Sequence, residues 1–373
     1  MSTDQLCFVV AGDAASVETR PRPTPKEGEC LVKVLLVGVC NTDLEILKGY
    51  MGFAGVVGHE FVGRVETAPA GSEHLVGQRV VGDINLCCNQ PASCKVCELG
   101  LSNPVARNHC PVRTVLGILN KDGCYAEYIT LPVVNLHLVP PNVSTENAAF
   151  VEPCAAQLGA AQFGAILREP GKLLTPPLFA SRRLAAACRI VEQGLVEPCD
   201  RVAVVGDGKL GLLIAEVLGR HVHALTPKAP PLVLLGRHTS KMGLVSADAG
   251  VESALSADAL PARAACFDVV VDATGSPAGI GLERQLLRPL GTLVLKSTCA
   301  AGADFNTAPF VVDELKVVGS RCGPFPPALK LLEGGLDLTK LIDATYPLAE
   351  AADAVAKAAT KGTMKVQIRV SAD

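Results

Sequence analysis

Residues Val202–Gly211 read VAVVGDGKLG and lead directly into the apolar run LLIAEVLG. The first four residues are apolar and mostly β-branched, as in a buried strand, and residues 206–211 fit the pattern G-x-G-x-x-G. In that pattern the first glycine allows a tight turn, the second lets the backbone approach a pyrophosphate, and the third lets the helix pack on the strand. The amino end of the helix then faces the anion. A strand before the glycines and a helix after them therefore predict a dinucleotide-binding turn rather than an accidental glycine loop.

The end of the next predicted strand bears on which nicotinamide cofactor is used. It reads LLGRHTSK (234–241), with no Asp or Glu to accept from the adenosine ribose, whereas Arg237 and Lys241 supply positive charge. Arginine at this place accommodates the 2′-phosphate of NADP, so the sequence favours NADP, with NAD as the alternative. A solvated basic loop would explain the same residues. The predicted cofactor contacts, which include the end of FDVVVDATG (267–275), are Gly206, Gly208, Lys209, Leu210, Gly211, Arg237, Lys241, Thr274 and Gly275.

The chain of 373 residues is longer than a single core usually grows, which predicts two domains. Its first part reads as short strands between Pro- and Gly-rich turns, with strands expected at Leu31–Val37, Phe61–Thr67 and Gln78–Val81. From Arg201 onward, apolar strands alternate with helices, which is typical of a parallel doubly wound sheet. We therefore expect an α/β protein in which a β-rich domain comprises 1–155 and 317–373, and a nucleotide-binding domain comprises 156–316.

Composition and charge exclude several classes of partner. The formal net charge is -3 and the basic residues are scattered, so neither nucleic acid nor an anionic membrane is expected as a partner. No apolar stretch approaches the roughly 18–20 residues needed to span a bilayer. The start, MSTDQLCFVVAGDAAS, lacks the pattern of a secretory signal. Fifteen cysteines in such a chain indicate thiols and metal ligands in a reducing compartment, so we expect a cytoplasmic protein.

Four residues in three short motifs could hold a catalytic metal. Cys40 lies in GVCNTD, His59 and Glu60 in GHEFVG, and Glu152 in FVEP. Thiolate and imidazole are preferred zinc ligands, and a catalytic zinc needs about three protein ligands and one open position. Each residue alone would be explained by burial in a core. Their joint occurrence predicts a catalytic zinc, with the choice between the two carboxylates left open.

A second group of cysteines lies at 86–111. Cys94 and Cys97 have the C-x-x-C spacing, and either Cys88 or Cys87, together with Cys110, would complete a set of four. Four thiolates close a tetrahedral structural zinc, which can hold together a long lobe that has little core of its own. A redox dithiol is the competing interpretation, but no strand followed by a helix surrounds the motif, as a redox site would require.

Several motifs, in this order, carry a resemblance to a known family: PRPTPKEGECLVKV, GVCNTDLEILKG, GHEFVG, DGCYAEYITLP, FVEP, the glycine loop and DATGS. The chain resembles the zinc-containing medium-chain dehydrogenase/reductase superfamily, in its alcohol, sorbitol and threonine dehydrogenase-like branch. The resemblance implies a GroES-like catalytic domain and a Rossmann domain, with the active site in the cleft between them. It also implies hydride transfer between an alcohol or polyol and NAD(P), in a homodimer or homotetramer.

The resemblance also implies roles for the motif residues. Cys40, His59 and Glu60 match the catalytic zinc motif, Glu152 matches the remaining ligand position, and Thr42 matches the hydroxyl that relays the alcohol proton. The structural zinc is matched best by Cys88, Cys94, Cys97 and Cys110. The rival functions are a zinc-independent quinone or enone reductase and a non-catalytic NADPH-binding protein.

Two segments depart from the family pattern. In the cysteine lobe, five residues separate Cys88 from Cys94 and twelve separate Cys97 from Cys110, where the family has two and seven. After FVEPCAA, about 28 extra residues at 157–184 precede AAACRIVEQG and include the helix-breaking GKLLTPPLFASRR. They are either a surface excursion or a retained non-coding stretch. Peptides from the native protein that span Leu173–Phe179 would eliminate the second explanation.

Overall fold

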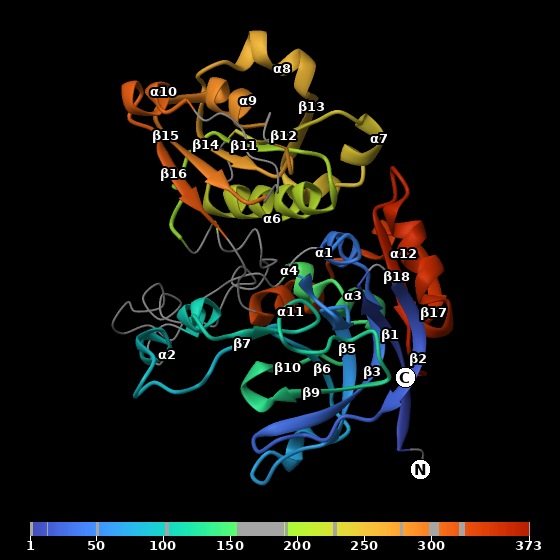
Figure 1. Ribbon diagram of the computed structural model, residues 1–373. Coiled ribbons are helices and arrows are strands. Elements are labelled where there is room, and N and C mark those ends of the chain that lie inside the picture. The colour runs from blue at the N-terminus through green and yellow to red at the C-terminus, as the bar shows by residue number, and fades with distance from the viewer. Residues whose placement is uncertain are drawn as a thin grey trace. The chain divides into compact units, whose positions relative to one another are not determined.

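The computed structural model describes residues 3–12, 14–49, 52–100, 104–154, 190, 193–226, 230–276, 279–297, 306–320 and 325–372. The chain divides into two compact units (Figure 1), and the described residues of the first are 3–154 and 325–372, whereas those of the second lie between 190 and 320. The predicted insertion at 157–184 lies outside the described residues. None of the described helices is long and apolar enough to span a membrane.

The first unit is rich in short β-strands. Its largest sheet has the order β10-β6-β5-β3-β18-β17, with β9 also paired to β3, and smaller sheets have the orders β2-β1-β4 and β7-β8. The strands are β1 (Asp4–Ala11), β2 (Ala14–Pro21), β3 (Glu29–Gly38), β4 (Gly55–Val56), β5 (Glu60–Thr67), β6 (Arg79–Gly82), β7 (Asn85–Leu86), β8 (Thr114–Val115), β9 (Tyr128–Pro132), β10 (Leu136–Leu138), β17 (Ile342–Pro347) and β18 (Lys365–Arg369).

Strand β3 is the centre of this unit. Eight of its ten residues are buried, which agrees with its run of Val and Leu, and it pairs antiparallel with β5, β9 and β18. Antiparallel pairing sets Gly38 opposite both Glu60 and Gln367. The C-terminal strand β18 is thereby brought to the carboxyl end of β3, close to the segment that carries Cys40.

Helices of the first unit are short. One of them, α12 (Ala351–Ala359), is clearly amphipathic: it buries Ala351, Ala354, Val355 and Ala358 at helical spacing and packs on β17 and β18. The other helical segments are α1 (Asn41–Ile46), η2 (Glu73–Leu75), α2 (Lys95–Leu99), η3 (Pro104–His109), η4 (Val133–Asn135), α3 (Thr145–Ala148), α4 (Val151–Cys154), α11 (Phe325–Glu333), η6 (Thr339–Leu341) and η7 (Leu348–Glu350).

The second unit is built on a parallel sheet of six strands in the order β13-β12-β11-β14-β15-β16. The central strands β11 and β14 are buried almost throughout, as expected for a parallel sheet covered on both faces. The strands are β11 (Val202–Val205), β12 (Leu232–Gly236), β13 (Val251–Leu255), β14 (Phe267–Asp272), β15 (Leu287–Leu295) and β16 (Lys316–Gly319).

Helices follow the strands of this second unit, as the alternating pattern predicts. The longest, α6 (Lys209–Leu225), begins directly after the glycine loop and packs on β11 and β12. The others are α7 (Thr239–Met242), η5 (Ala247–Ala249), α8 (Ser256–Arg263), α9 (Gly279–Leu286) and α10 (Ala308–Val312). The predicted α/β fold class, with a β-rich domain and a doubly wound parallel sheet, is confirmed.

The division between the units differs in detail from the expected boundary at residue 317. Strand β16 pairs with β15 in the parallel sheet and therefore lies wholly in the second unit, which ends at Gly323. A boundary at 317 would cut this strand. The difference arises because LKVVGS is an edge strand whose pairing partner cannot be read from its own residues.

A buried acid in the second unit predicts a pH-dependent stability. Glu283 on α9 is fully buried, and neither carboxylate oxygen has a hydrogen-bond partner among the described residues. Burial, and then the nearby charge of Asp272, raise the pKa of Glu283 to about 9. The folded protein therefore retains the proton of Glu283 at pH values at which the unfolded chain, with the ordinary glutamate pKa of 4.5, releases it. Stability contributed at this group falls as the pH rises from about 4.5 to about 9.

The substitution Glu283→Gln replaces this acid by a neutral group of the same shape. We expect the variant to be about as stable as the parent at pH 5 and more stable by about 1–3 kcal/mol at pH 8. At pH 8 the unfolded parent is stabilised by releasing the proton of Glu283, whereas the glutamine variant has no proton to release. Urea midpoints at the two pH values would measure the difference. The exposed Glu197→Gln, in the same unit, serves as the control. Parallel pH curves for Glu283→Gln and the parent would contradict the prediction.

Candidate active site and metal centres

The glycine turn of the second unit is shaped to admit a backbone-bound ligand. Gly206 has φ +123°, and a Cβ there would lie 2.5 Å from the carbonyl oxygen of Ala273. A Cβ on Gly211 would lie 1.9 Å from the carbonyl oxygen of Gly206, so helix and turn touch through these two glycines. At Gly208, which precedes α6, a Cβ would meet no atom within 4 Å. The turn is thus close-packed behind and open in front, as pyrophosphate binding requires.

The other predicted cofactor residues follow the neighbouring strands. Lys209 and Leu210 open α6, Arg237 follows β12, and Lys241 lies on α7. Thr274 and Gly275 follow β14, which pairs with β11. The backbone N–H of Thr274 donates to Asp272 Oδ1 at 2.9 Å, and that of Gly275 donates to Ser297 Oγ, also at 2.9 Å. All nine residues therefore lie at the carboxyl ends of strands β11, β12 and β14, or on the helices that follow β11 and β12.

In the first unit, Cys40, His59 and Glu60 come together although 18 residues separate the first two. One ligand atom of each lies within 4.8 Å of those of the other two. Cys40 precedes α1. Glu60 is the first residue of β5 and lies opposite Gly38, and His59 immediately precedes it. Thr42, on the first turn of α1, places Oγ1 3.7 Å from the sulfur of Cys40.

Asp43 supports this group from behind and was not predicted from the sequence. It is fully buried, and its Oδ1 lies 3.2 Å from Nδ1 of His59. Its Oδ2 accepts from the backbone N–H of Cys40 at 2.9 Å and from the Tyr125 hydroxyl at 3.0 Å. With Nδ1 turned toward Asp43, Nε2 is the nitrogen that His59 offers to a metal. A carboxylate behind a histidine ligand is the usual arrangement at zinc sites.

Lys365 is a second buried residue that the sequence did not indicate. Its Nζ contacts Glu60 Oε2 at very close range and donates to the carbonyl of Val39 at 3.4 Å. Both side chains of the Lys365–Glu60 pair are almost fully buried. Gly38 makes room for the contact, since a Cβ there would lie 2.8 Å from Cε of Lys365. One oxygen of Glu60 is therefore engaged by an ammonium group.

Glu152, on α4, lies outside the group that Cys40, His59 and Glu60 form. Burial raises the pKa of its carboxyl to about 7, and the nearby charges of His59 and Glu60 act on it in opposite directions. The predicted fourth ligand is therefore in the electrostatic neighbourhood of the cluster without being within 4.8 Å of all its members.

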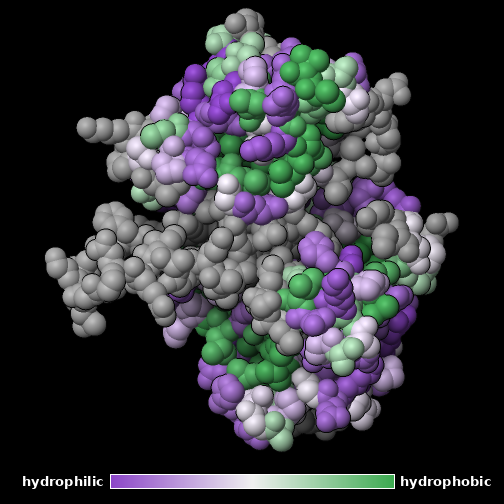
Figure 2. Space-filling model, turned by 90° about the vertical axis from the view of Figure 1, so that its left-hand side faces the viewer, coloured by the Kyte–Doolittle hydropathy of each residue, from purple (hydrophilic) through white to green (hydrophobic). Residues whose placement is uncertain are grey.

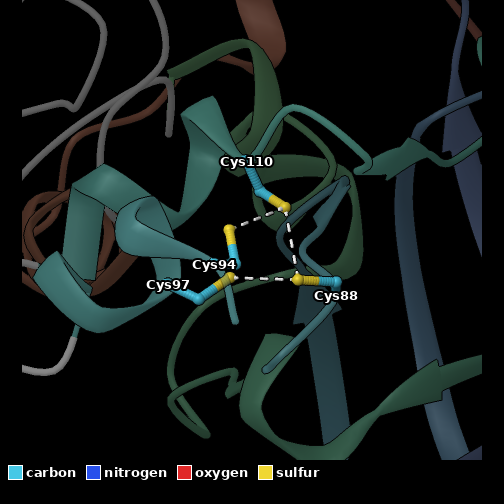
Figure 3. Close-up of side chains that lie close together, drawn as sticks. All are labelled: Cys88, Cys94, Cys97 and Cys110. Atoms are coloured by element: carbon cyan, nitrogen blue, oxygen red, sulfur yellow. Dashed lines mark hydrogen bonds between the residues drawn. The ribbon is translucent and has the colours of Figure 1, made fainter. Parts of the chain in front are cut away.

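The four predicted cysteines of the lobe converge (Figure 3). The sulfur of Cys88 lies 3.5 Å from that of Cys97 and 3.6 Å from that of Cys110, and Cys94 and Cys110 are 3.9 Å apart. Zn–S bonds of about 2.3 Å at tetrahedral angles would separate sulfurs by about 3.8 Å. These donors and spacings fit a closed structural zinc. The longer gap between Cys97 and Cys110 contains the end of α2 and all of η3.

The donor set of the first cluster also fits zinc. It combines a thiolate, an imidazole nitrogen and a carboxylate, and the buried Nδ1 of His59 has a carboxylate at 3.2 Å to hold the ring in place.

Comparisons with known proteins agree with both parts of the chain. Residues 26–141 match the family description "Alcohol dehydrogenase GroES-like domain". D-altritol 5-dehydrogenase of Agrobacterium fabrum is 29% identical over 374 residues, which cover 96% of this chain and 97% of that one. The chain carries an alcohol dehydrogenase GroES-like domain and is similar along nearly its whole length to a polyol dehydrogenase, as the zinc-containing medium-chain dehydrogenase/reductase resemblance implies. It is an alcohol dehydrogenase-like oxidoreductase, and the family predicted from its motifs is confirmed.

Solved structures show the same fold over the whole chain. An alcohol dehydrogenase of Escherichia coli CFT073, complexed with NADH, has a TM-score of 0.80 at 22% identity and covers 99% of this chain and 100% of that one. A zinc-binding dehydrogenase of Sinorhizobium meliloti 1021, bound to NADP, has a TM-score of 0.77 at 23% identity, with the same coverage.

Proposed function

We propose that this dehydrogenase transfers a hydride between the CH–OH group of an alcohol or polyol and NAD(P), with a catalytic and a structural zinc. The observation that carries the proposal is the convergence of Cys40, His59 and Glu60 above the buried carboxylate of Asp43. A thiolate and an imidazole are preferred zinc ligands, and a carboxylate that orients the imidazole from behind is typical of zinc sites. A core packed only for stability would not require this combination.

The two carboxylates of the site have different roles in this proposal. Lys365 already neutralises Glu60, and a carboxylate held by an ammonium group is a weaker metal ligand than a free one. We therefore assign Cys40, His59 and Glu152 as the three protein ligands, with Glu60 held in reserve beside them. This leaves the fourth position of a catalytic zinc for water or substrate.

The chemistry is divided between the cofactors and the chain. When bound, zinc supplies a Lewis acid for the substrate oxygen and the nicotinamide supplies the hydride acceptor. Thr42 carries the proton: its Oγ1, 3.7 Å from the sulfur of Cys40, accepts the proton of the substrate hydroxyl while its own proton passes outward. Asp43 keeps the His59 ring fixed so that only one nitrogen is presented.

The glycine turn and the residues after β12 and β14 bind the nicotinamide cofactor in this proposal. Arg237 is exposed and makes no ion pair with any described residue, so its guanidinium is available to a 2′-phosphate. This supports NADP as cofactor, with NAD as the alternative. Neighbours with either cofactor bound are known, one with NADP and one with NADH.

The substrate is a small alcohol. Relatives named as D-altritol 5-dehydrogenase and sorbitol dehydrogenase, which span nine-tenths or more of this chain, support a polyol. Nucleic acid and membranes remain unexpected as partners, given the net charge of -3.

A homodimer or homotetramer, formed through the second unit, is supported by its surface. Figure 2 looks onto the side of the second unit that carries α10 and β16, where hydrophobic residues gather on its surface. Val311 and Val312 are 73% and 79% exposed, and Leu290 and Val317 add to them. β16 ends the parallel sheet, and such an edge can pair with a copy of itself. Light scattering that reports a monomer would contradict this assembly.

A cytoplasmic location is proposed because none of the cysteines that the structure describes forms a disulfide, as expected of metal ligands and thiols in a reducing compartment. Recovery of the native protein in a secreted fraction would contradict it.

Zinc content and turnover test the proposed function together. Elemental mass spectrometry of the purified chain should give about two zinc ions per chain, and chelation should abolish oxidation of polyols with NADP or NAD. Glu152→Gln should lose more zinc than Glu60→Gln, because only Glu152 is assigned as a ligand. Full turnover without zinc would favour the zinc-independent reductase, and cofactor binding without any turnover would favour the non-catalytic protein.

A further inference from the structure

The turn after β12 contains a carboxylate that does not come from the turn itself. Asp207, the second residue of the glycine loop, is buried with 6% of its surface exposed. Its Oδ2 accepts from the backbone N–H of Arg237 at 2.7 Å and of His238 at 2.6 Å. The same oxygen lies 2.9 Å from Nδ1 of His238. The loop of residues 234–241 lacks an acid of its own, yet the fold supplies one from 30 residues earlier.

Gly236 shows that Asp207 takes the place of a strand-end side chain. A Cβ on Gly236 would lie 2.6 Å from Cβ of Asp207 and 2.9 Å from its Cγ, and on the other side 2.7 Å from the sulfur of Met242. No side chain fits at Gly236 while Asp207 holds this position. The last residue of β12 is where a nucleotide-binding fold of this type usually carries the acid that reads the adenosine ribose. Here the position is glycine and the space beside it is filled by the carboxylate of Asp207.

The second oxygen of this carboxylate is left for another donor. All three contacts of Asp207 are made by Oδ2, and Oδ1 has no hydrogen bond within the described part of the chain. Burial tends to raise the pKa of Asp207, but hydrogen bonds from His238 and from the backbone of Arg237 outweigh it and hold the pKa below its ordinary value. The group is thus a fixed, ionised acceptor beside an open glycine turn.

We propose that Asp207 is the acid of the adenosine ribose subsite and sets the choice between the two nicotinamide cofactors in opposition to Arg237. Its carboxylate accepts from the ribose hydroxyls of NAD and repels the 2′-phosphate of NADP, which the guanidinium of Arg237 attracts. The chain therefore accepts both cofactors, and each residue favours one. The proposal rests on the proposed function, since it requires the glycine turn to bind a nicotinamide cofactor.

The substitution Asp207→Asn separates this role from a structural one. An amide oxygen can still accept from the two backbone N–H groups, so the turn keeps its shape, while the negative charge is lost. The amide nitrogen then stands where the second carboxylate oxygen was. As a donor it can bind a phosphate, but it cannot accept from the ribose hydroxyls. A carboxylate that merely held the turn would affect both cofactors equally.

The test is calorimetric titration of the zinc-loaded protein with NADH and with NADPH, which measures dissociation constants without turnover. In Asp207→Asn, the dissociation constant for NADH should rise about ten- to a hundredfold, while that for NADPH stays unchanged or falls. In Arg237→Ala, the constant for NADPH should rise about tenfold or more, with little change for NADH. Asp248→Asn, whose carboxylate binds Arg220 in the same unit, is the matched control and should change neither constant.

Equal weakening of both cofactors in Asp207→Asn, or no change in either, would overturn the role of Asp207. If the asparagine variant does not fold, Asp207→Ser provides the same comparison with a smaller acceptor. A parent protein that binds neither cofactor would instead overturn the proposed function. The two failures are thus distinguished by the parent protein alone.

Discussion

Replacement of His59 by alanine is expected to lower kcat for alcohol oxidation by about a thousandfold or more. The substitution removes one of the protein ligands proposed for the catalytic zinc, and the charge stabilisation that a Lewis acid gives to the substrate oxygen amounts to several kcal/mol. Each 1.36 kcal/mol corresponds to about a tenfold change in rate. The loss also leaves the fully buried Asp43 without its histidine partner. Steady-state rates and zinc content of the same preparation would measure both effects.

Two further variants locate the source of that loss. Asp43→Asn keeps the ligands and removes only the carboxylate behind His59, so we expect a smaller effect of about 10- to 100-fold in zinc affinity or rate. The exposed His74→Ala, on η2 of the same unit, should leave the rate unchanged. If His59→Ala retained activity within a few-fold of the parent, the proposed catalytic zinc would be wrong and a zinc-independent reductase would be the better assignment.

Local patterns predicted the features that depend on adjacent residues. The turn Gly206–Gly211 is such a case, since strand, glycines and helix follow one another in the chain and each glycine has its own steric reason. The cysteine cluster was equally predictable, because four thiols in one short lobe have few other uses. The choice of Cys88 over Cys87, however, depends on the direction in which the chain leaves β7, which spacing alone does not give.

The supporting residues of the site could not be predicted in this way. Asp43 is three residues from Cys40, and its distance from His59 becomes short only when β3 and β5 pair. The N-capping position of Cys40 and the acid three residues later are a signal that could have identified Asp43. Asp207 and Arg237 are neighbours only because β11 and β12 lie side by side. Neither the residues of the glycine loop nor those of the turn after β12 predict this contact by themselves.

Lys365 is the extreme case, since it lies 305 positions after Glu60 in the chain. Its strand, MKVQIRV, reads as an ordinary buried strand with two basic residues, of which only one is exposed. Lys365 and Arg369 lie four residues apart on β18 and therefore on the same face of the strand, so the alternation of side chains does not show which of them is buried. The role of this lysine could therefore be inferred only from the structure, which shows its contact with Glu60.

The ion pair predicts the largest change in stability. Lys365→Met would leave the carboxylate of Glu60, which is 1% exposed, without its ammonium partner in a buried setting. Loss of one member of a buried ion pair typically destabilises a protein by about 3–5 kcal/mol, because the remaining charge stays uncompensated. We expect a loss of that size in the free energy of unfolding of the zinc-loaded protein, measured from urea midpoints.

The double variant Lys365→Met with Glu60→Gln tests whether the loss arises from the unpaired charge. A neutral pair of similar volume removes the uncompensated carboxylate, and such replacements are often neutral or stabilising. The double variant should therefore be more stable than Lys365→Met alone by about 2 kcal/mol or more, which is a coupling expected for residues in contact. Additive losses in the double variant would mean that Lys365 stabilises the strand by packing alone. Recovery would instead show that the sequence keeps a buried lysine at β18 because Glu60 stands beside the proposed zinc ligand His59 and requires a counter-charge.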